Sequence, residues 1–495
     1  MSEKIILKSY RNSVDKDYVG FTPNGASVKP VHIANGSLRC IYGAYNTTMR
    51  IKRLALVSDS KGVVPKGNAV SEVRDYLIEE EALEETVSEG SLESMRNVMQ
   101  RLLSADKGVY VVKGLKDDML SYSAGSKYFL TKRSMYEDTG EFIGGVIKEY
   151  CPELSEYIKS LLNKGNDPIS LLFEPVLEDD TMETFEIARH EDCPAFKNPT
   201  KAMDWFVNGI KEGGICLTQN FKRHPNPLTQ LRLFNYFCIF HIIRYMTMLE
   251  AFYCDDTHRP ILLDFSGMSP SQSSVARASE MSYTQMYKAI NRFYAWGYAE
   301  KLKGLSKEEL LKSDTPVYEE NKKPSDAVKK ELDILWEVAK DRAASIDELS
   351  EIRMIFGETI YDMLALEASS HPVNYLRAMG TSAGILYPPD KLHPNKRFAV
   401  SQDVLEMLLR SCVMPNEVLS GKEIRERMWE RFGVIIGGTP FEMEKLRDNG
   451  SLLQVDEDAL ESNFAAFADT LESMDFAEVM ADGILQIRLG GVNHD

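Results

Sequence analysis

The chain of 495 residues lacks the short signatures that identify many nucleotide-dependent enzymes. It contains no G-x-x-x-x-G-K-[ST] loop, no G-x-G-x-x-G turn and no kinase catalytic-loop sequence. Each of these motifs places backbone amides or a charged group where a phosphate must sit. Their absence excludes a P-loop nucleotidase, a Rossmann dehydrogenase and a protein kinase. It says less against nucleases, because the carboxylates of a nuclease are spread along the sequence.

Cysteine is sparse and scattered. The chain has seven cysteines and no C-x-x-C pair, and His190 and Cys193 stand three apart without a second pair. This pattern excludes a zinc finger, and we expect no metal site and no cofactor. An odd number of isolated cysteines is typical of thiols in a reducing compartment. Because the first residues are too polar for a signal segment, we expect a cytoplasmic protein.

Basic charge is also in short supply. Lysine and arginine total 58 against 75 acidic residues, so the net charge is −17. Such a balance argues against a protein whose main surface binds a phosphate backbone. Two local exceptions are candidates for nucleic-acid contact: the basic strand with Arg50, Lys52 and Arg53, and the segment Lys222-Arg223. The alternative for both is an ordinary solvated surface.

No uncharged apolar run in the sequence reaches the length that a membrane span needs. Residues 228–253 read LTQLRLFNYFCIFHIIRYMTMLEAFY, with apolar side chains on nearly every side of a helix. Arg232, Arg244 and Glu250 interrupt the run, and a span needs ~20 apolar residues. A helix without a polar face is then a core helix that other elements must surround. Within it, His241 is either a buried titrating group or a core histidine with one hydrogen bond.

Three acidic residues follow predicted strands and are the candidates for catalysis. Asp264 ends the strand that begins at Pro260, and Glu174 and Asp180 lie in and after the apolar run 170–177. Carboxylates at strand ends can bind a divalent metal, as in metal-dependent nucleases. The plainer alternative is that Asp264 caps the turn after its strand and that Asp180 lies in a polar hairpin turn.

Periodicity and breakers suggest an α+β protein, β-containing in its N-terminal half and mostly helical in its C-terminal half. Asn24-Gly25 and Asn35-Gly36 suggest turns between short N-terminal strands. Proline and polar residues at 304–325 favour a linker. We therefore expect a small β-rich region (1–66), a mixed α/β domain (67–303), the linker (304–325), a helical region (326–412) and a winged-helix-like domain (413–495).

The C-terminal unit has the clearest local pattern. Ser420 and Glu423 have the spacing of a capping box, and Gly433 is placed to end that helix. A short strand, a second helix and an Asp-Gly hairpin follow, which is the order of a winged helix. However, residues 451–480 carry eight acidic residues and no lysine or arginine. A helix of that charge would be repelled by DNA, so this unit is better suited to protein contact.

Three C-terminal strings carry a resemblance to a known group of proteins. They are Tyr375-Leu-Arg-Ala-Met-Gly380 with the nearby Ile385-Leu-Tyr-Pro388, then Lys396-Arg-Phe398, then Glu430–Gly438. They are similar to the C-terminal part of accessory proteins encoded in prokaryotic multi-gene antiphage defence operons. The resemblance covers about the last quarter of the chain. It implies a partner in a nucleic-acid-targeting assembly and brings no catalytic residues.

These observations favour a non-catalytic subunit or adaptor of a cytoplasmic multi-protein complex, with protein partners and no membrane association. Nucleic acid could be contacted only through the local basic segments. Two alternatives stay open at this level. One is a metal-dependent nuclease or hydrolase using Glu174, Asp180 or Asp264, and the other is a DNA-binding regulator with a C-terminal winged helix.

Overall fold

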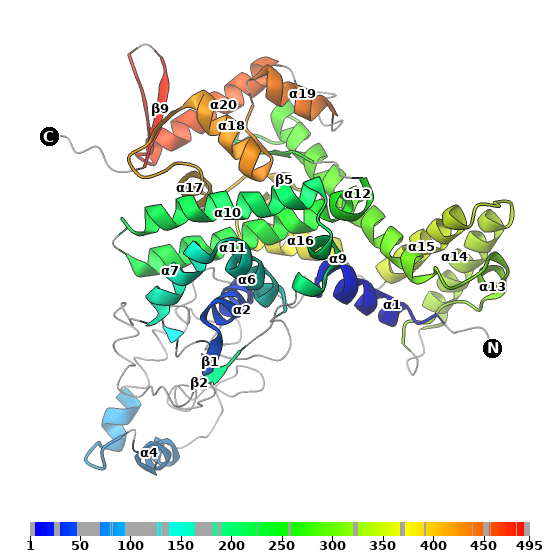
Figure 1. The fold of residues 1–495 in the computed structure, drawn as a ribbon, viewed down its shortest axis with the longest axis horizontal. Coiled ribbons are helices and arrows are strands. Elements are labelled where there is room, and N and C mark those ends of the chain that lie inside the picture. The colour runs from blue at the N-terminus through cyan, green and yellow to red at the C-terminus, as the bar shows by residue number, and fades with distance from the viewer. Residues whose placement is uncertain are drawn as a thin grey trace.

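The computed structural model describes residues 5–23, 30–46, 70–79, 81, 83–94, 126–127, 130, 138–163, 182–185, 190–224, 226–255, 259–319, 325–366, 372–390, 393–437, 439–448, 455, 457–481 and 483–489. Within these ranges the protein contains both helices and strands, and the helices dominate (Figure 1). The sheets are small: three pairs of strands and one sheet of three strands.

Helix α11 (Pro227–Glu250) lies at the centre and continues into the π-helical turn η7 (Ala251–Asp255). From Leu233 to Glu250 every one of its residues is buried. Among the helices around it are α2 (Pro30–Tyr42), α6 (Asp138–Tyr150), α10 (Lys201–Phe221), α12 (Ser274–Lys301) and α17 (Gln402–Arg410). Residues 227–254 are long and apolar enough to cross a membrane, but 89% of the relevant window is buried inside the protein. The prediction of a surrounded core helix is confirmed.

The expected N-terminal strands are wrong where the structure describes them. Of the strand expected at 4–8, residues 7 and 8 begin helix α1 (Leu7–Val14). The strands expected at 30–34 and 38–42 both belong to the single helix α2. Nearly all of α2 is buried, so no exposed polar face at helical spacing marks it as a helix in the sequence. The Asn35-Gly36 pair is not a turn but lies within α2, where a Cβ atom added at Gly140 of α6 would come within 2.9 Å of the Gly36 Cα. The strand expected at 50–58 lies outside the described residues.

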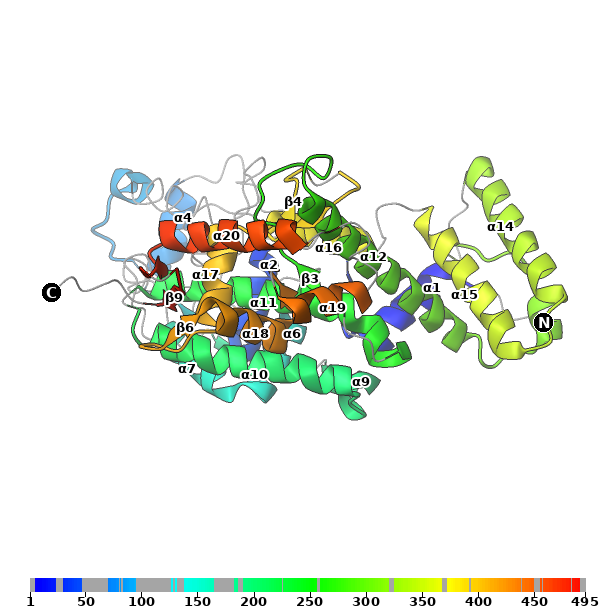
Figure 2. The ribbon, with the colours of Figure 1, turned by 90° about the horizontal axis from the view of Figure 1, so that it is seen from above.

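Helices α12, α14 (Asp326–Ala344) and α15 (Leu349–Ala365) form an arm that projects from the main body (Figures 1 and 2). Helix α12 belongs to both, since its first half packs in the body and its second half packs along α15. The segment expected to be a linker contains α13 (Lys307–Lys312), and Leu310 there is fully buried. It is therefore a packed connection in its described part.

The C-terminal unit begins with β6 (Val418–Ser420) and α18 (Gly421–Phe432), followed by β7 (Val434–Ile435) and α19 (Pro440–Asp448). It ends with α20 (Glu457–Ser473), β8 (Ala477–Val479) and β9 (Leu485–Arg488). The sheet order is β6-β9-β8, antiparallel throughout. The capping box of Ser420 and Glu423 is present, and Gly433 ends α18 with a left-handed φ of 68°. Both of these local predictions are confirmed.

Two contacts fix this unit to the core. Strand β7 pairs in parallel with β3 (Ile261–Leu262), the strand that follows the central helix. In addition, the end of α18 lies against α10 at Gly209. A Cβ atom added at Gly209 would come within 2.1 Å of the backbone oxygen of Arg431 and 2.7 Å of the guanidinium of Arg244. Only glycine permits the two helices to approach this closely.

The smaller elements complete the body. They are α4 (Val70–Glu79), α7 (Pro152–Asn163), the 3-10 helix η6 (His190–Asp192), α9 (Pro194–Lys197) and α16 (Pro372–Ser382). Strands β1 (Ala44–Asn46) and β2 (Met182–Thr184) form one antiparallel pair. Strands β4 (Leu386–Tyr387) and β5 (Arg397–Phe398) form another, and β5 places Arg397 beside the end of β3.

Replacing Gly209 with alanine tests the close approach of α10 and α18. Alanine favours an isolated helix by about 1 kcal/mol over glycine. Because the added methyl group meets backbone here, we expect Gly209→Ala to lower the free energy of unfolding by about 1–3 kcal/mol, measured in urea. Gly304→Ala is the control, since nothing lies within 4 Å of a Cβ at that position. Equal or higher stability of the Gly209 variant would contradict this packing.

Candidate functional site

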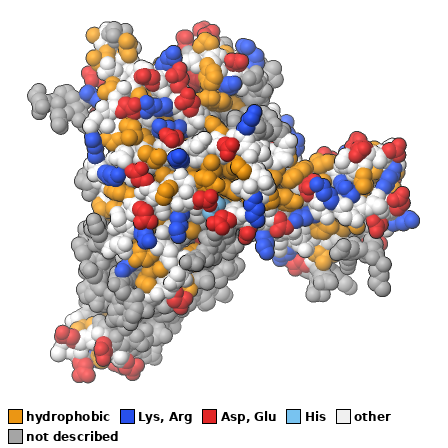
Figure 3. Space-filling model, viewed as in Figure 1, with side chains coloured by type: hydrophobic (Ala, Val, Ile, Leu, Met, Phe, Trp, Pro, Cys, Tyr) orange, Lys and Arg blue, Asp and Glu red, His pale blue; other side chains and the backbone are white. Residues whose placement is uncertain are grey.

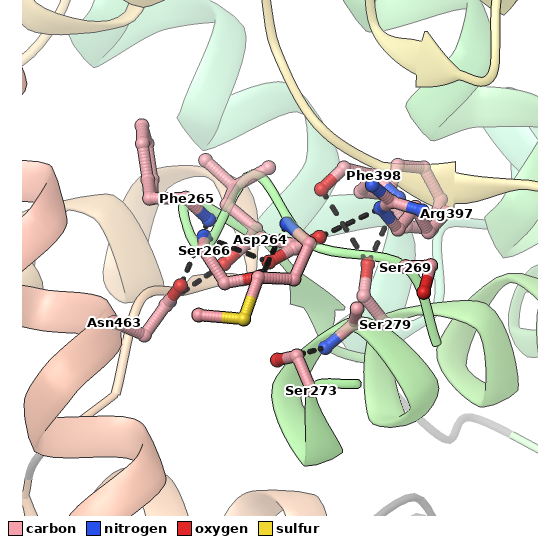
Figure 4. A network of polar contacts seen from close by, with 12 residues as sticks. Asp264, Phe265, Ser266, Ser269, Ser273, Ser279, Arg397, Phe398 and Asn463 are labelled. Atoms are coloured by element: carbon pink, nitrogen blue, oxygen red, sulfur yellow. Dashed lines mark hydrogen bonds and ion pairs between the residues drawn. The ribbon is translucent and has the colours of Figure 1, made fainter. Parts of the chain in front are cut away.

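Asp264 is held in a buried ion pair at the end of β3. Its Oδ2 lies 2.7 Å from Nε of Arg397, and the two side chains are 1% and 8% exposed. Its Oδ1 accepts hydrogen bonds from the backbone nitrogen of Ser266 at 2.9 Å and from the Ser266 hydroxyl at 2.6 Å (Figure 4). Both oxygens are engaged, so the carboxylate caps the turn and neutralises Arg397. This is the plainer of the two alternatives for Asp264.

The surrounding polar contacts connect three distant parts of the chain (Figure 4). From α12, the Ser279 hydroxyl donates to the Leu262 carbonyl at 2.8 Å and accepts from the Phe398 amide at 2.9 Å. From α20, the Asn463 side-chain nitrogen donates to the carbonyls of Leu263 and Ile436 at 2.9 and 2.6 Å. These buried bonds hold strands β3, β5 and β7 together. The network is a structural joint.

Of the other predicted site residues, the structure describes Lys222 and Arg223. Glu174, Asp180, Arg50, Lys52 and Arg53 lie outside the described residues. Lys222 and Arg223 lie exposed on the turn after α10. Lys222 pairs with Glu153 at 3.2 Å, and Arg223 donates to the side-chain oxygen of Asn416.

A groove of about 470 Å³ between α12 and α15 is lined by three carboxylates: Glu250, Glu358 and Asp362. Glu250 is only 7% exposed and forms ion pairs with Arg259 and Arg292. Burial, with a smaller effect of the Glu358 charge, raises the pKa of Asp362. Since two arginines neutralise Glu250, the groove does not present three free carboxylates to a metal.

A hollow lies in the C-terminal unit, between α18 and the start of α19. It measures about 620 Å³, within the range of ligand pockets. Its lining comprises Lys422, Arg425, Glu426, Trp429, Glu430, Thr439, Pro440, Phe441 and Glu442. The rings of Trp429 and Phe441 meet edge to face at 5.8 Å, and Phe441 is 43% exposed. We call this cavity the aromatic hollow.

The polar groups of the aromatic hollow hold its walls in place. Glu442 is buried and accepts hydrogen bonds from the amides of Ile436 and Gly437 and from the Thr439 hydroxyl. The Arg425 guanidinium donates to the Gly437 carbonyl at 2.8 Å and lies 4.0 Å from the centre of the Phe464 ring. The hollow is therefore preformed. A ligand would meet the rings of Trp429 and Phe441 together with charged side chains.

The β8–β9 hairpin adds a second exposed apolar surface. Val479, Met480 and Ile484 at its tip are 46%, 39% and 51% exposed. Hydrophobic side chains cover this protrusion at the upper left of Figure 3. In the part of the chain that the structure describes, six of the ten exposed large hydrophobic side chains fall between 414 and 484. Contiguous patches of exposed apolar side chains are typical of interaction sites.

The outer face of α20 carries the opposite character. Its exposed charged residues are Glu457, Asp458, Glu461, Asp469 and Glu472. The inner face of the same helix buries Leu460, Asn463, Phe467 and Leu471. The exposed charges of this helix are thus all negative. In the sequence, the helix lies between the residues of the aromatic hollow and those of the hairpin tip.

A string with the G-x-S-x-G spacing of a nucleophile elbow runs from Gly380 to Gly384 and did not figure among the sequence candidates. An elbow places its serine on a sharp turn from a strand into a helix. Here Ser382 is the last residue of α16, and Gly384, with φ of 68°, leads from that helix into β4. The order is reversed, so the string is a helix C-terminus.

No protein-family model matches the chain, and no curated protein matches it. The assignment of a function therefore depends on the geometry.

A double-mutant cycle tests the structural role of Asp264. Asp264→Asn leaves Arg397 buried without its counter-charge, so we expect unfolding in urea to require about 3–5 kcal/mol less free energy. Asp264→Asn with Arg397→Met should lose clearly less than the sum of the two single changes. The control is Glu337→Gln, which breaks an exposed pair with Lys340 and should cost under about 1 kcal/mol. Wild-type stability of Asp264→Asn would mean that the carboxylate is available for another role.

Proposed function

We propose that this protein is a non-catalytic adaptor subunit of a multi-protein complex and that it binds its partner through the C-terminal unit. The observation that carries the proposal is the concentration of exposed apolar side chains on the aromatic hollow and the hairpin tip. The centres of protein interfaces are rich in aromatic residues that fill or form pockets. An open, aromatic hollow with fixed walls suits a large apolar anchor side chain of a partner.

We further propose that the C-terminal unit is a winged-helix variant. The order α17, β6, α18, α20, β8, β9 and the sheet order β6-β9-β8 support this assignment. The pair β7 and α19 would then be an insertion between the second and third helices. The third helix of such a unit usually enters the DNA major groove. Here that helix is α20, whose exposed face is acidic.

The charge of α20 and the apolar hairpin tip both disfavour DNA. Affinity for a duplex comes largely from lysine and arginine at phosphates, and a tip of Val479, Met480 and Ile484 offers none. A protein partner is consistent with the same surface, because it can cover the apolar tip and present basic residues to α20. On the resemblance to antiphage defence accessory proteins, we place the complex in the cytoplasm of a prokaryote, near a nucleic-acid-targeting assembly.

The nuclease alternative has lost its best-placed residue. Asp264 is paired with Arg397, and the remaining candidates Glu174 and Asp180 lie outside the described residues. The alternative of a DNA-binding regulator is disfavoured because the exposed face of α20 is acidic and would be repelled by DNA. The adaptor is therefore the function that the described surfaces support best.

Variants of the aromatic hollow and hairpin tip test this function. The tagged chain is purified from its native cell at moderate salt, and co-purifying proteins are quantified. We expect Trp429→Ala, Phe441→Ala and Met480→Asp each to lower the amount of the same co-purifying protein by at least ~10-fold. The reason is that an anchor residue at an interface contributes ~1.4 kcal/mol or more to the binding free energy. The matched control is Ile334→Asp, which alters an equally exposed apolar residue, 54% exposed, on α14.

Two results would contradict the adaptor function. One is Mg²⁺-dependent degradation of DNA or RNA by the purified chain. The other is tight duplex binding that falls steeply with salt and disappears when residues 415–495 are deleted. Thermal melting of each variant confirms that it is folded, so a loss of partner reports on the surface itself.

A further inference from the structure

A cluster of side chains that can ligate a metal ion lies where α6 ends beside η6, far from the C-terminal unit in sequence. It consists of Glu149, His190 and Glu191, and the nearest ligand atoms of the three side chains all lie within 4.8 Å of one another. Glu149 is on α6 and the other two residues are on η6. Sequence pairing of His190 with Cys193 did not reveal this group, because Glu149 is 41 residues away.

The imidazole of His190 is fixed before any ligand arrives. Its side chain is 3% exposed, and its ring meets the edges or faces of Phe142 and Phe196 with centroids 6.5 and 5.4 Å away. The absence of a side chain at Gly145 makes room for it, since a Cβ there would lie 2.7 Å from Nδ1. The ring therefore packs with Nδ1 against α6 and presents Nε2 to the Glu149 carboxylate, 2.5 Å away.

The electrostatics of this cluster favour a cation. Two carboxylates face one imidazole, and Asp192 adds a further charge next to them in sequence. The carboxyl end of α6, which ends at Tyr150, contributes the negative end of its dipole. Burial, followed by the nearby Glu149 carboxylate, raises the pKa of Tyr150 to about 12.

We propose that Glu149, His190 and Glu191 bind one divalent transition-metal ion, with Zn²⁺ or Mn²⁺ as the best fit. One imidazole nitrogen and two carboxylate oxygens form a mixed set that these ions accept, whereas Ca²⁺ and Mg²⁺ prefer oxygen alone. Metal–ligand bonds of about 2.1 Å require the ligand atoms to lie about 3 Å or more apart. The Glu149 carboxylate now lies 2.5 Å from Nε2 of His190, which is closer than this spacing. Because its side chain is 45% exposed, it can move outward to make room for the ion.

Cys193 is not part of this site. It is fully buried, and a Cβ at Gly20 would lie 2.8 Å from its sulfur, which places the thiol against the N-terminal segment. Burial raises the pKa of its thiol to about 12, so it stays protonated at neutral pH. With three protein ligands and two of them exposed, the remaining coordination positions of the ion would be open to water. The site is independent of the adaptor function, because it shares no residue with the aromatic hollow or the hairpin tip.

Metal binding is measured on the full chain, purified without a metal-affinity column and treated with EDTA. Isothermal titration uses ZnCl₂, MnCl₂ and MgCl₂ as separate probes. We expect one Zn²⁺ or Mn²⁺ per chain, at least ~10-fold weaker binding of Mg²⁺, and a higher melting temperature in saturating Zn²⁺. Because imidazole and carboxylate groups bind a metal ion only in their deprotonated forms, the affinity should fall as the pH is lowered.

Variants separate this site from adventitious binding. Glu149→Gln, Glu191→Gln and His190→Gln should each weaken binding by at least ~10-fold and abolish the melting shift. Cys193→Ser and Glu156→Gln, the latter on the exposed side of α7, should bind as the wild type does. The two glutamate variants change exposed side chains, so they test the site even where His190→Gln is unstable. Absence of saturable binding, or binding that all three variants retain, would overturn the proposal.

Discussion

The burial of α11 is the constraint on which the rest of the structure depends. A helix that is apolar on every side needs packing partners on every side, because any uncovered face would expose apolar side chains to water. The chain covers it with N-terminal helices such as α2 and α6 and with α10, α12 and α17. Segments from one end of the sequence to the other therefore share one continuous core. The Phe240 and Phe432 rings, 5.5 Å apart, carry that core into the C-terminal unit.

This attachment explains why Asp264 is buried in an ion pair with Arg397. Where β3 leaves the core, its backbone contacts β5, β7 and α20. Each of these contacts buries polar groups. Buried polar groups are costly unless they are paired, and the Asp264–Arg397 pair, Ser279 and Asn463 provide the partners. The same burial turns the inner face of α20 toward the core. The outer surface of the unit carries the exposed apolar hairpin tip and the acidic face of α20.

The sequence was informative where structure is local. Residues 228–253 indicated a buried helix, and the spacing of Ser420 and Glu423 gave the capping box, because both features depend on neighbours within a few turns. The sequence was misleading at α2, where Asn35-Gly36 resembles a turn but lies inside the helix, close to Gly140 of α6. Long-range groupings were inaccessible: the partner of Asp264 is Arg397, and Glu149 meets His190 only through the fold. The aromatic hollow escaped notice because Trp429 and Phe441 look like ordinary core residues in a sequence.

The central claim is that the C-terminal unit is built onto the wall of the α11 core, which leaves only its outer surface for a partner. Native-state hydrogen exchange followed by mass spectrometry tests this claim most directly. The account predicts that amides in α11 are the slowest to exchange and that those in α18 and on the inner side of α20 open with nearly the same free energy. Exchange of α18 and α20 by orders of magnitude faster than α11 would show a separately opening domain and contradict the account.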